Sequence, residues 1–132
     1  MPTVGVLKMR IAILGVGSLG GVLVGSLSDT EAELLCVSRG ETAASLELGL
    51  VVHSPEGAIE MVPSERYEVV DSEVGPISNS HRESCDVAII TGKASSTPVL
   101  ASIAEELLAP GGMGMSIQNG LGHAEGCVRR CH

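Results

Sequence analysis

The sequence has almost no aromatic side chains and few basic ones. Its 132 residues include no Trp and no Phe, and Tyr67 is the single aromatic residue. Recognition of nucleic acid by stacking bases on aromatic side chains is therefore excluded. Eight Lys and Arg residues stand against 16 Asp and Glu, which gives a formal net charge of −8. Such a chain has no broad basic face to neutralise phosphates, so we expect neither nucleic acid nor a membrane surface as a partner.

The chain also lacks a dense set of cysteines and long uninterrupted apolar runs. The chain has four Cys residues, and their pattern is not the dense disulfide framework of a small secreted domain. Cys36 and Cys85 lie in or beside apolar runs, where a free Cys packs as a small hydrophobic residue. The uncharged stretch 11–28 is interrupted by five glycines, a poor composition for a signal peptide or a membrane helix. We therefore expect a cytoplasmic protein.

Glycine and aliphatic residues, in contrast, are abundant. At about 150 residues per domain the length predicts one domain, which we place at residues 8–130. Short apolar runs typical of strands alternate with helical patterns, and a hairpin is predicted at 50–62. The predicted strands are 10–14, 34–37, 67–70, 86–91 and 113–118. The first predicted helix follows the first glycines, and the others occupy 43–48, 96–108 and a last segment through Arg130. Helices that connect successive strands imply a parallel sheet, so the fold class is α/β, a Rossmann-type doubly wound, mainly parallel sheet.

Two of the predicted helices have apolar stripes at helical spacing. The members of these stripes are expected to face the sheet; they are Leu19, Val22, Leu23 and Leu27 in the first helix and Val99, Leu100, Ile103, Ala104, Leu107 and Leu108 in the third.

The strongest motif is the segment Gly15-Val16-Gly17-Ser18-Leu19-Gly20, which follows a predicted strand and opens a predicted helix. In this context the pattern is typical of a dinucleotide site. Gly15 allows the tight turn, Gly17 the close approach of a pyrophosphate, and Gly20 close packing of helix on strand. The free N–H groups of the helix N-terminus attract the phosphates. The alternative is a tight turn with packing glycines and no ligand.

The end of the second strand indicates which dinucleotide binds. An NAD site usually has an acidic residue there, but the chain has Ser38 and Arg39. Arg39 can pair with a 2′-phosphate and stack on adenine, and Ser38 can add a hydroxyl hydrogen bond. This favours NADP(H). Two alternatives remain: Arg39 is a solvated surface residue, or Glu41 serves a ribose hydroxyl.

Two polar residues follow the later strands. Lys93 comes shortly after the strand 86–91, and Asn119 follows the strand 113–118. Ligands of open α/β sheets bind at these carboxyl ends, so both side chains are candidates for contacting cofactor or substrate. Each taken singly is equally well explained as a surface residue or a turn former.

The C-terminal segment holds a possible set of metal ligands, namely His123, Cys127, Cys131 and His132. On a helix these residues would spread over about 12 Å, too far for all of them to reach one ion. No metal site is expected.

Taken together, these motifs resemble the N-terminal domain of the ketopantoate reductases (2-dehydropantoate 2-reductases). The resemblance rests on Ile11 to Gly21, Ser38-Arg39, Lys93-Ala94 and Gln118 to Gly122. It implies NADPH-dependent reduction of 2-dehydropantoate to pantoate, a step of pantothenate and coenzyme A synthesis. It also implies that Gly15 to Gly20 hold the pyrophosphate, Arg39 holds the 2′-phosphate, Lys93 lies against the cofactor, and Asn119 contacts both cofactor and substrate.

The chain departs from the family in its length. The resemblance implies a further helical C-terminal domain, which carries the general-acid Lys and most substrate contacts, and this sequence stops at His132. We therefore expect no catalytic residue within the chain, a small 2-oxo acid as substrate when such a domain is supplied, and self-association through the face left open. The alternatives are a non-catalytic NADP(H)-binding or sensing module that docks on a partner, and another reductase such as an imine or hydroxy-acid dehydrogenase.

Overall fold

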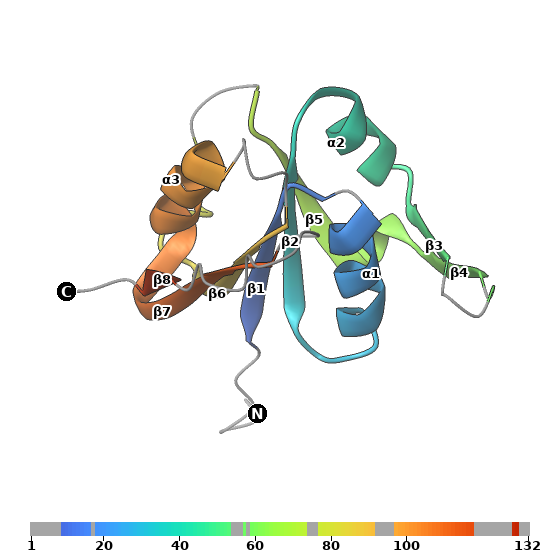
Figure 1. The fold of residues 1–132 in the computed structure, drawn as a ribbon, viewed down its shortest axis with the longest axis horizontal. Coiled ribbons are helices and arrows are strands. Elements are labelled where there is room, and N and C mark those ends of the chain that lie inside the picture. The colour runs from blue at the N-terminus through green and yellow to red at the C-terminus, as the bar shows by residue number, and fades with distance from the viewer. Residues whose placement is uncertain are drawn as a thin grey trace.

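The fold is built on one twisted sheet with helices on both faces (Figure 1). The computed structural model describes residues 9–16, 18–53, 57, 59–73, 77–91, 97–117 and 128–129. Six strands form the sheet in the order β5-β2-β1-β6-β7-β8. The first five are parallel, and β8 is antiparallel to β7. Their bounds are β1 Arg10–Leu14, β2 Glu33–Ser38, β5 Tyr67–Asp71, β6 Cys85–Ile90, β7 Leu108–Ser116 and β8 Val128–Arg129.

The remaining elements cover the sheet. Helix α1 (Ser18–Leu27) and the antiparallel hairpin β3–β4 (Leu50–His53 and Ile59–Val62) lie on one side, and α3 (Thr97–Leu107) lies on the other (Figure 1). The short α2 (Gly40–Leu46) follows β2, and a 3-10 turn (Ser64–Arg66) precedes β5. The predicted Rossmann-type architecture and the predicted hairpin are confirmed. No helix in this described part of the chain is long and apolar enough to cross a membrane.

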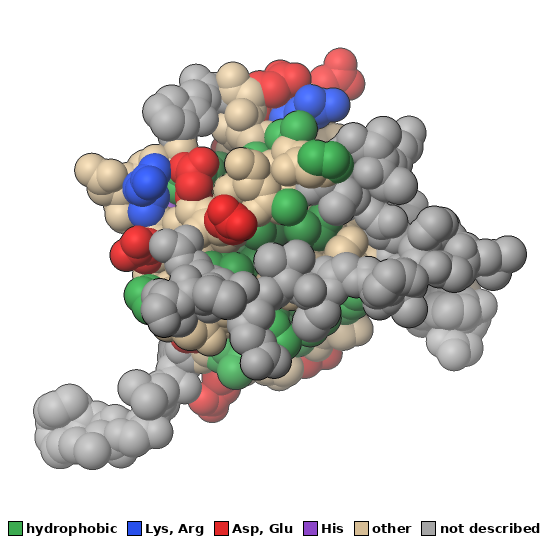
Figure 2. All heavy atoms as spheres, turned by 60° about the vertical axis from the view of Figure 1, so that its left-hand side comes forward, with side chains coloured by type: hydrophobic (Ala, Val, Ile, Leu, Met, Phe, Trp, Pro, Cys, Tyr) green, Lys and Arg blue, Asp and Glu red, His purple; other side chains and the backbone are tan. Residues whose placement is uncertain are grey.

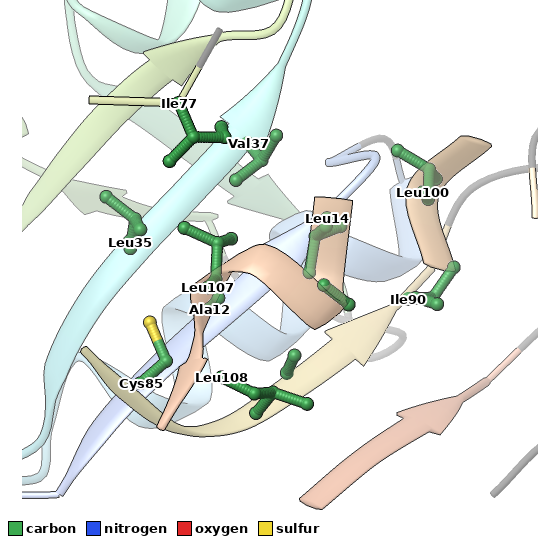
Figure 3. Close-up of a cluster of buried hydrophobic side chains, with 12 residues drawn as sticks. Ala12, Leu14, Leu35, Val37, Ile77, Cys85, Ile90, Leu100, Leu107 and Leu108 are labelled. Atoms are coloured by element: carbon green, nitrogen blue, oxygen red, sulfur yellow. The ribbon is translucent and has the colours of Figure 1, made fainter. Parts of the chain in front are cut away.

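The central strands form because both of their faces are buried. In β1, Ile11 and Ile13 pack on the α1 side, whereas Ala12 and Leu14 pack on the α3 side. Successive side chains of a strand point to opposite faces, so a strand covered on both sides needs an apolar residue at every position. Figure 3 shows the cluster on the α3 side, where side chains of the strands meet Leu100 and Leu107.

Helix α1 packs on the core through Leu23 and Leu27, as predicted, and also faces its neighbours with glycines. A Cβ added at Gly21 or Gly25 would lie 3.7 Å from Leu50 or 3.1 Å from Val52, so the hairpin packs directly on the helix backbone. Val24 is fully buried, and the prediction for Val22 is wrong because 44% of its surface is exposed. The contact is tightest at Gly25, where the absence of a side chain lets Val52 of the hairpin approach the helix backbone.

Helix α3 packs through Leu100, Ala104 and Leu107, as predicted, but Val99 is 62% exposed. The buried positions recur at intervals of four and three residues, and Val99 lies off that line. Figure 2, in which this side of the molecule is brought forward, shows acidic side chains standing beside hydrophobic ones on the surface.

The last strands differ from the prediction. Strand β7 begins at Leu108, which was predicted to belong to the preceding helix, and not at Met113. The pairing register with β6 shifts between the pairs Cys85–Leu108 and Val87–Met113. The predicted helix through Arg130 is wrong at 128–129, which pair with β7 as strand β8. This pairing satisfies backbone groups that β7 would otherwise expose along its edge. The other predicted helix residues, and the four candidate metal ligands, lie outside the described residues.

Candidate cofactor site at the carboxyl edge of the sheet

The carboxyl ends of the parallel strands meet along one edge of the sheet. Leu14 at the end of β1 pairs with Val37 on one side and with Ile90 on the other. The chain therefore turns away from β1, β2 and β6 at neighbouring points. The strand order also reverses here, since β2 and β5 lie on one side of β1 and β6 and β7 on the other. Ligands of open α/β sheets bind at such a reversal.

The turn from β1 into α1 is bound tightly to the end of β2. Gly15 has a φ of +79°, which a residue with a side chain adopts only with strain. Its N–H donates to the carbonyl of Val37 at 2.7 Å, and the N–H of Val16 donates to the Ser38 hydroxyl at 3.2 Å. Gly15 and Val16 therefore shape the turn with their N–H groups already engaged. Gly17 lies outside the described residues.

The N-terminus of α1 suits an anion. Residues 18–20 open the ten-residue helix, and the first N–H groups of any helix have no acceptor within it. Its first turn contains no acidic residue that would compete for these donors. The aligned peptide dipoles add positive partial charge at this end. The donor set fits a pyrophosphate, although the side chains of Ser18 and Leu19 lie outside the described residues.

Gly20 lets the helix touch the end of β6. A Cβ at this position would lie 2.7 Å from the Thr91 hydroxyl oxygen, closer than such atoms approach one another, and 3.5 Å from both Ile13 and Val16. The predicted packing role of Gly20 is thereby confirmed, and its closest neighbour is identified as Thr91.

Sequence reasoning did not single out Thr91. This residue is 9% exposed, and its hydroxyl lies 3.1 Å from the carbonyl oxygen of Leu14 and 3.0 Å from that of Gly15. A Thr directly after an apolar strand is too common to stand out in a sequence. Its partners are 76 and 77 residues away, so only the folded chain brings them together.

The end of β2 presents Arg39 to solvent. Its backbone is extended, its side chain is exposed, and it forms no ion pair with another residue in the described part of the chain. The following residue, Gly40, has a φ of +62° and donates to the Asp71 carboxylate at 3.3 Å. Ser38, predicted to join Arg39 in binding phosphate, is buried and holds Val16.

Two acidic residues at and just after the end of β5, Asp71 and Glu73, lie near Gly40, whereas only Glu41 was considered from the sequence as an acidic residue of this site. Asp71 also accepts the backbone N–H of Glu73 at 3.0 Å. The Glu73 carboxylate approaches Gly40, with one oxygen 3.6 Å from the site of an added Cβ. Arg39 therefore precedes Gly40, whose surroundings are acidic. At this end of a dinucleotide site an acidic group accepts a hydrogen bond from a ribose hydroxyl, whereas an Arg binds a 2′-phosphate.

Lys93 and Asn119 lie outside the described residues, so their roles stay predictions. The strands that lead to them are neighbours: Ile90 pairs with Ser116, and the N–H of Ile117 donates to the carbonyl of Ile90 at 2.8 Å. The two segments therefore depart from adjacent strand ends. Among the described residues, no group of three His, Cys, Asp or Glu side chains could hold a metal ion.

A hollow of about 830 Å³ lies at the opposite edge of the sheet. Its Arg10 is bound to Glu33 at 3.1 Å and to Glu68 at 3.0 Å. Burial opposes the charge of Arg10, but these hydrogen bonds outweigh it and raise its pKa, and the same contact with Arg10 lowers the pKa of Glu68. Arg66 donates to the carbonyls of Ser28 and Thr30. Arg10 and Arg66, the two cations of this hollow, are thus engaged within the protein.

The family follows from a comparison that spans this site. The model of the family described as ketopantoate reductase PanE/ApbA matches residues 11–131, which include the glycine turn, Arg39 and the ends of β6 and β7. The chain belongs to the ketopantoate reductase family. Members of this family are oxidoreductases, and the matching N-terminal domain is a nucleotide-binding Rossmann domain. No curated protein sequence matches the chain.

Solved structures share the fold. A provisionally assigned ketopantoate reductase from Ralstonia solanacearum MolK2 is similar over 86% of this chain, with 24% identity and a TM-score of 0.64. The match covers 33% of that protein, so the present chain spans about a third of its length. Atu636, a predicted O-methyltransferase from Agrobacterium tumefaciens, has 22% identity and a TM-score of 0.55 over 84% of this chain and 54% of its own. One fold thus serves different chemistries.

Proposed function

We propose that this ketopantoate reductase family chain binds NADP(H) and serves the reduction of a 2-oxo acid such as 2-dehydropantoate. The observation that supports this most is the exposed Arg39, which has no ion-pair partner among the described residues and directly follows β2, the strand next to the glycine turn. A free guanidinium at that point matches a 2′-phosphate in charge and geometry.

The residues of the chain divide the binding between them. The N-terminus of α1 holds the pyrophosphate with backbone N–H groups, and Gly20 keeps the helix close to the sheet. Arg39 holds the 2′-phosphate at the adenosine end. Lys93 and Asn119, which follow the neighbouring strands β6 and β7, orient the nicotinamide end and the substrate. A bound reduced nicotinamide supplies a hydride to the 2-oxo carbon, and the carbonyl oxygen then needs a proton donor.

Cofactor titration tests the proposal directly. We expect NADPH to bind more tightly than NADH, measured by nicotinamide fluorescence or calorimetry. Arg39→Ala is expected to weaken NADPH about tenfold, the value of a charge-assisted hydrogen bond of roughly 1.4 kcal/mol, and to leave NADH unchanged. Arg82→Ala is the matched control, since Arg82 is also exposed but pairs with Glu106. Equal affinity for both cofactors, or an Arg39→Ala variant as selective as the parent, would contradict the proposal.

Turnover separates binding from catalysis. The resemblance places the general-acid Lys in a helical domain beyond the family segment matched here. We therefore expect the 132 residues by themselves to bind NADPH without oxidising it when 2-dehydropantoate is added. The absorbance of the reduced nicotinamide, at about 340 nm, measures the oxidation. Addition of a family C-terminal domain is expected to restore turnover. Rapid oxidation by the 132 residues alone, abolished by Asn119→Ala, would show that the proton donor lies within this chain.

A further inference from the structure

We propose that two buried hydroxyls, from Thr91 and Ser38, clamp the peptide plane between Gly15 and Val16 and so keep its carbonyl turned away from the cofactor's phosphates. This inference rests on the proposed function, because it assigns Thr91 and Ser38 as positioning residues of the same site. Neither residue is expected to act on the cofactor's reacting atoms.

The clamp holds both ends of one peptide group. The carbonyl oxygen of Gly15 lies 3.0 Å from the Thr91 hydroxyl at the end of β6. The N–H of Val16, which belongs to the same peptide plane, donates to the Ser38 hydroxyl at 3.2 Å at the end of β2. Thr91 is 9% exposed and Ser38 is 6% exposed. The two hydroxyls thus come from the strands on either side of β1 and reach the same turn.

Thr91 is itself fixed in place. Its backbone N–H donates to the carbonyl of Leu14 at 2.8 Å, and its hydroxyl also lies 3.1 Å from that oxygen. The hydroxyl shares its single proton between the carbonyls of Leu14 and Gly15. Both carbonyl oxygens at the end of β1 are consequently engaged by β6.

The orientation of this peptide matters because an anion is expected beside it. A carbonyl oxygen carries negative partial charge and repels phosphate, whereas the N–H groups that open α1 attract it. Gly15, with its φ of +79°, lacks the side chain that would restrict rotation of the adjoining peptide. The hydroxyls supply the restraint that the glycine lacks, and the site is therefore prepared for a phosphate before one binds.

Isosteric and conservative substitutions test the clamp. Thr91→Val keeps the volume but removes the hydroxyl, and we expect it to weaken NADPH and NADH alike by about five- to tenfold. Thr91→Ser restores the hydroxyl and is expected to bind both within about twofold of the parent. Ser38→Ala releases the other end of the peptide and is expected to behave as Thr91→Val does. This equal loss for both cofactors differs from the NADPH-selective loss expected for Arg39→Ala.

A probe without pyrophosphate distinguishes positioning from general damage. Adenosine 2′-monophosphate presents its phosphate to Arg39 and carries none for the glycine turn. We expect its affinity to be unchanged in Thr91→Val, in Thr91→Ser and in Ser38→Ala.

If Thr91→Val lost this probe as well, or if it bound NADPH as the parent does, the clamp would be overturned while the cofactor proposal stood. Failure of the parent chain to bind NADPH at all would overturn both. If Thr91→Val does not fold, the comparison of Ser38→Ala with Thr91→Ser decides the matter.

Discussion

Replacing Gly20 with Ala is expected to abolish most of the cofactor affinity and to destabilise the domain. The new methyl group would lie 2.7 Å from the Thr91 hydroxyl oxygen, so Thr91 must rotate and release the carbonyls of Leu14 and Gly15. Overpacking of this kind costs about 1–3 kcal/mol. We expect a comparable loss of NADPH binding, at least about tenfold. The general dinucleotide pattern tolerates Ala at its third glycine, so the conflict is specific to the facing Thr91.

Gly21→Ala is the matched control for this substitution. A Cβ at Gly21 would meet Leu50 at 3.7 Å, an ordinary contact. Both substitutions gain about 1 kcal/mol of helix propensity, so the difference between their free energies of unfolding isolates the contact with Thr91. Denaturant titration of the two variants measures that difference, which we expect to be about 1–3 kcal/mol.

A double-mutant cycle then tests the contact itself. Thr91→Ala removes the atom that a methyl group at Gly20 would strike, and the next neighbours, Ile13 and Val16, are 3.5 Å away. The double variant is therefore expected to be more stable than the sum of the single changes predicts, by about 1 kcal/mol or more. Strict additivity would show that the destabilisation arises elsewhere in the turn.

Alkaline pH is expected to destabilise the domain through Cys36. This thiol is fully buried, with no exposed surface, and burial raises its pKa from 9.0 to about 12. A raised pKa in the folded state stabilises the protein below pH 9, and this contribution is lost as the pH rises towards 12. At about 1.36 kcal/mol for each pH unit, the full loss is about 4 kcal/mol, and about half of it occurs by roughly pH 10.5.

Unfolding by denaturant between about pH 8 and 10.5 measures this loss. We expect Cys36→Ala to be less stable at neutral pH, because a buried sulfur is removed, yet to lose less stability as the pH rises. A residual decline should remain in the variant, since burial also raises the pKa of Tyr67 and of Cys85. Parallel pH profiles for the parent and Cys36→Ala would exclude this thiol as the cause.

Most of the sheet could be predicted from the sequence because its strands are buried on both faces. The unbroken apolar runs 11–14 and 87–90 are a local signal, and so is the helical pattern that follows a glycine turn. Gly15, with its φ of +79°, likewise acts through its own backbone conformation. Such local patterns can be recognised without knowing which other elements pack against the segment.

Three of the wrong predictions concern surfaces whose neighbours the sequence does not reveal. Val22 was expected to be buried, but the hairpin packs on glycines beside it. Residues 128–129 were expected to be helical, but they pair with β7. Val99 belongs to an apolar pattern that is wider than the contact surface of α3. In each case packing against a distant element overrode a local preference.

The sequence by itself determined that this chain is a Rossmann-type domain with a glycine turn and an arginine at the end of the next strand, because both signals are carried by a few consecutive residues. Only the tertiary structure decided how that turn is held. Thr91 lies 76 residues from Gly15, and Ser38 lies 22 residues from Val16. Hydrogen bonds between such distant groups form only after parallel pairing has brought the carboxyl ends of β2, β1 and β6 together at one edge.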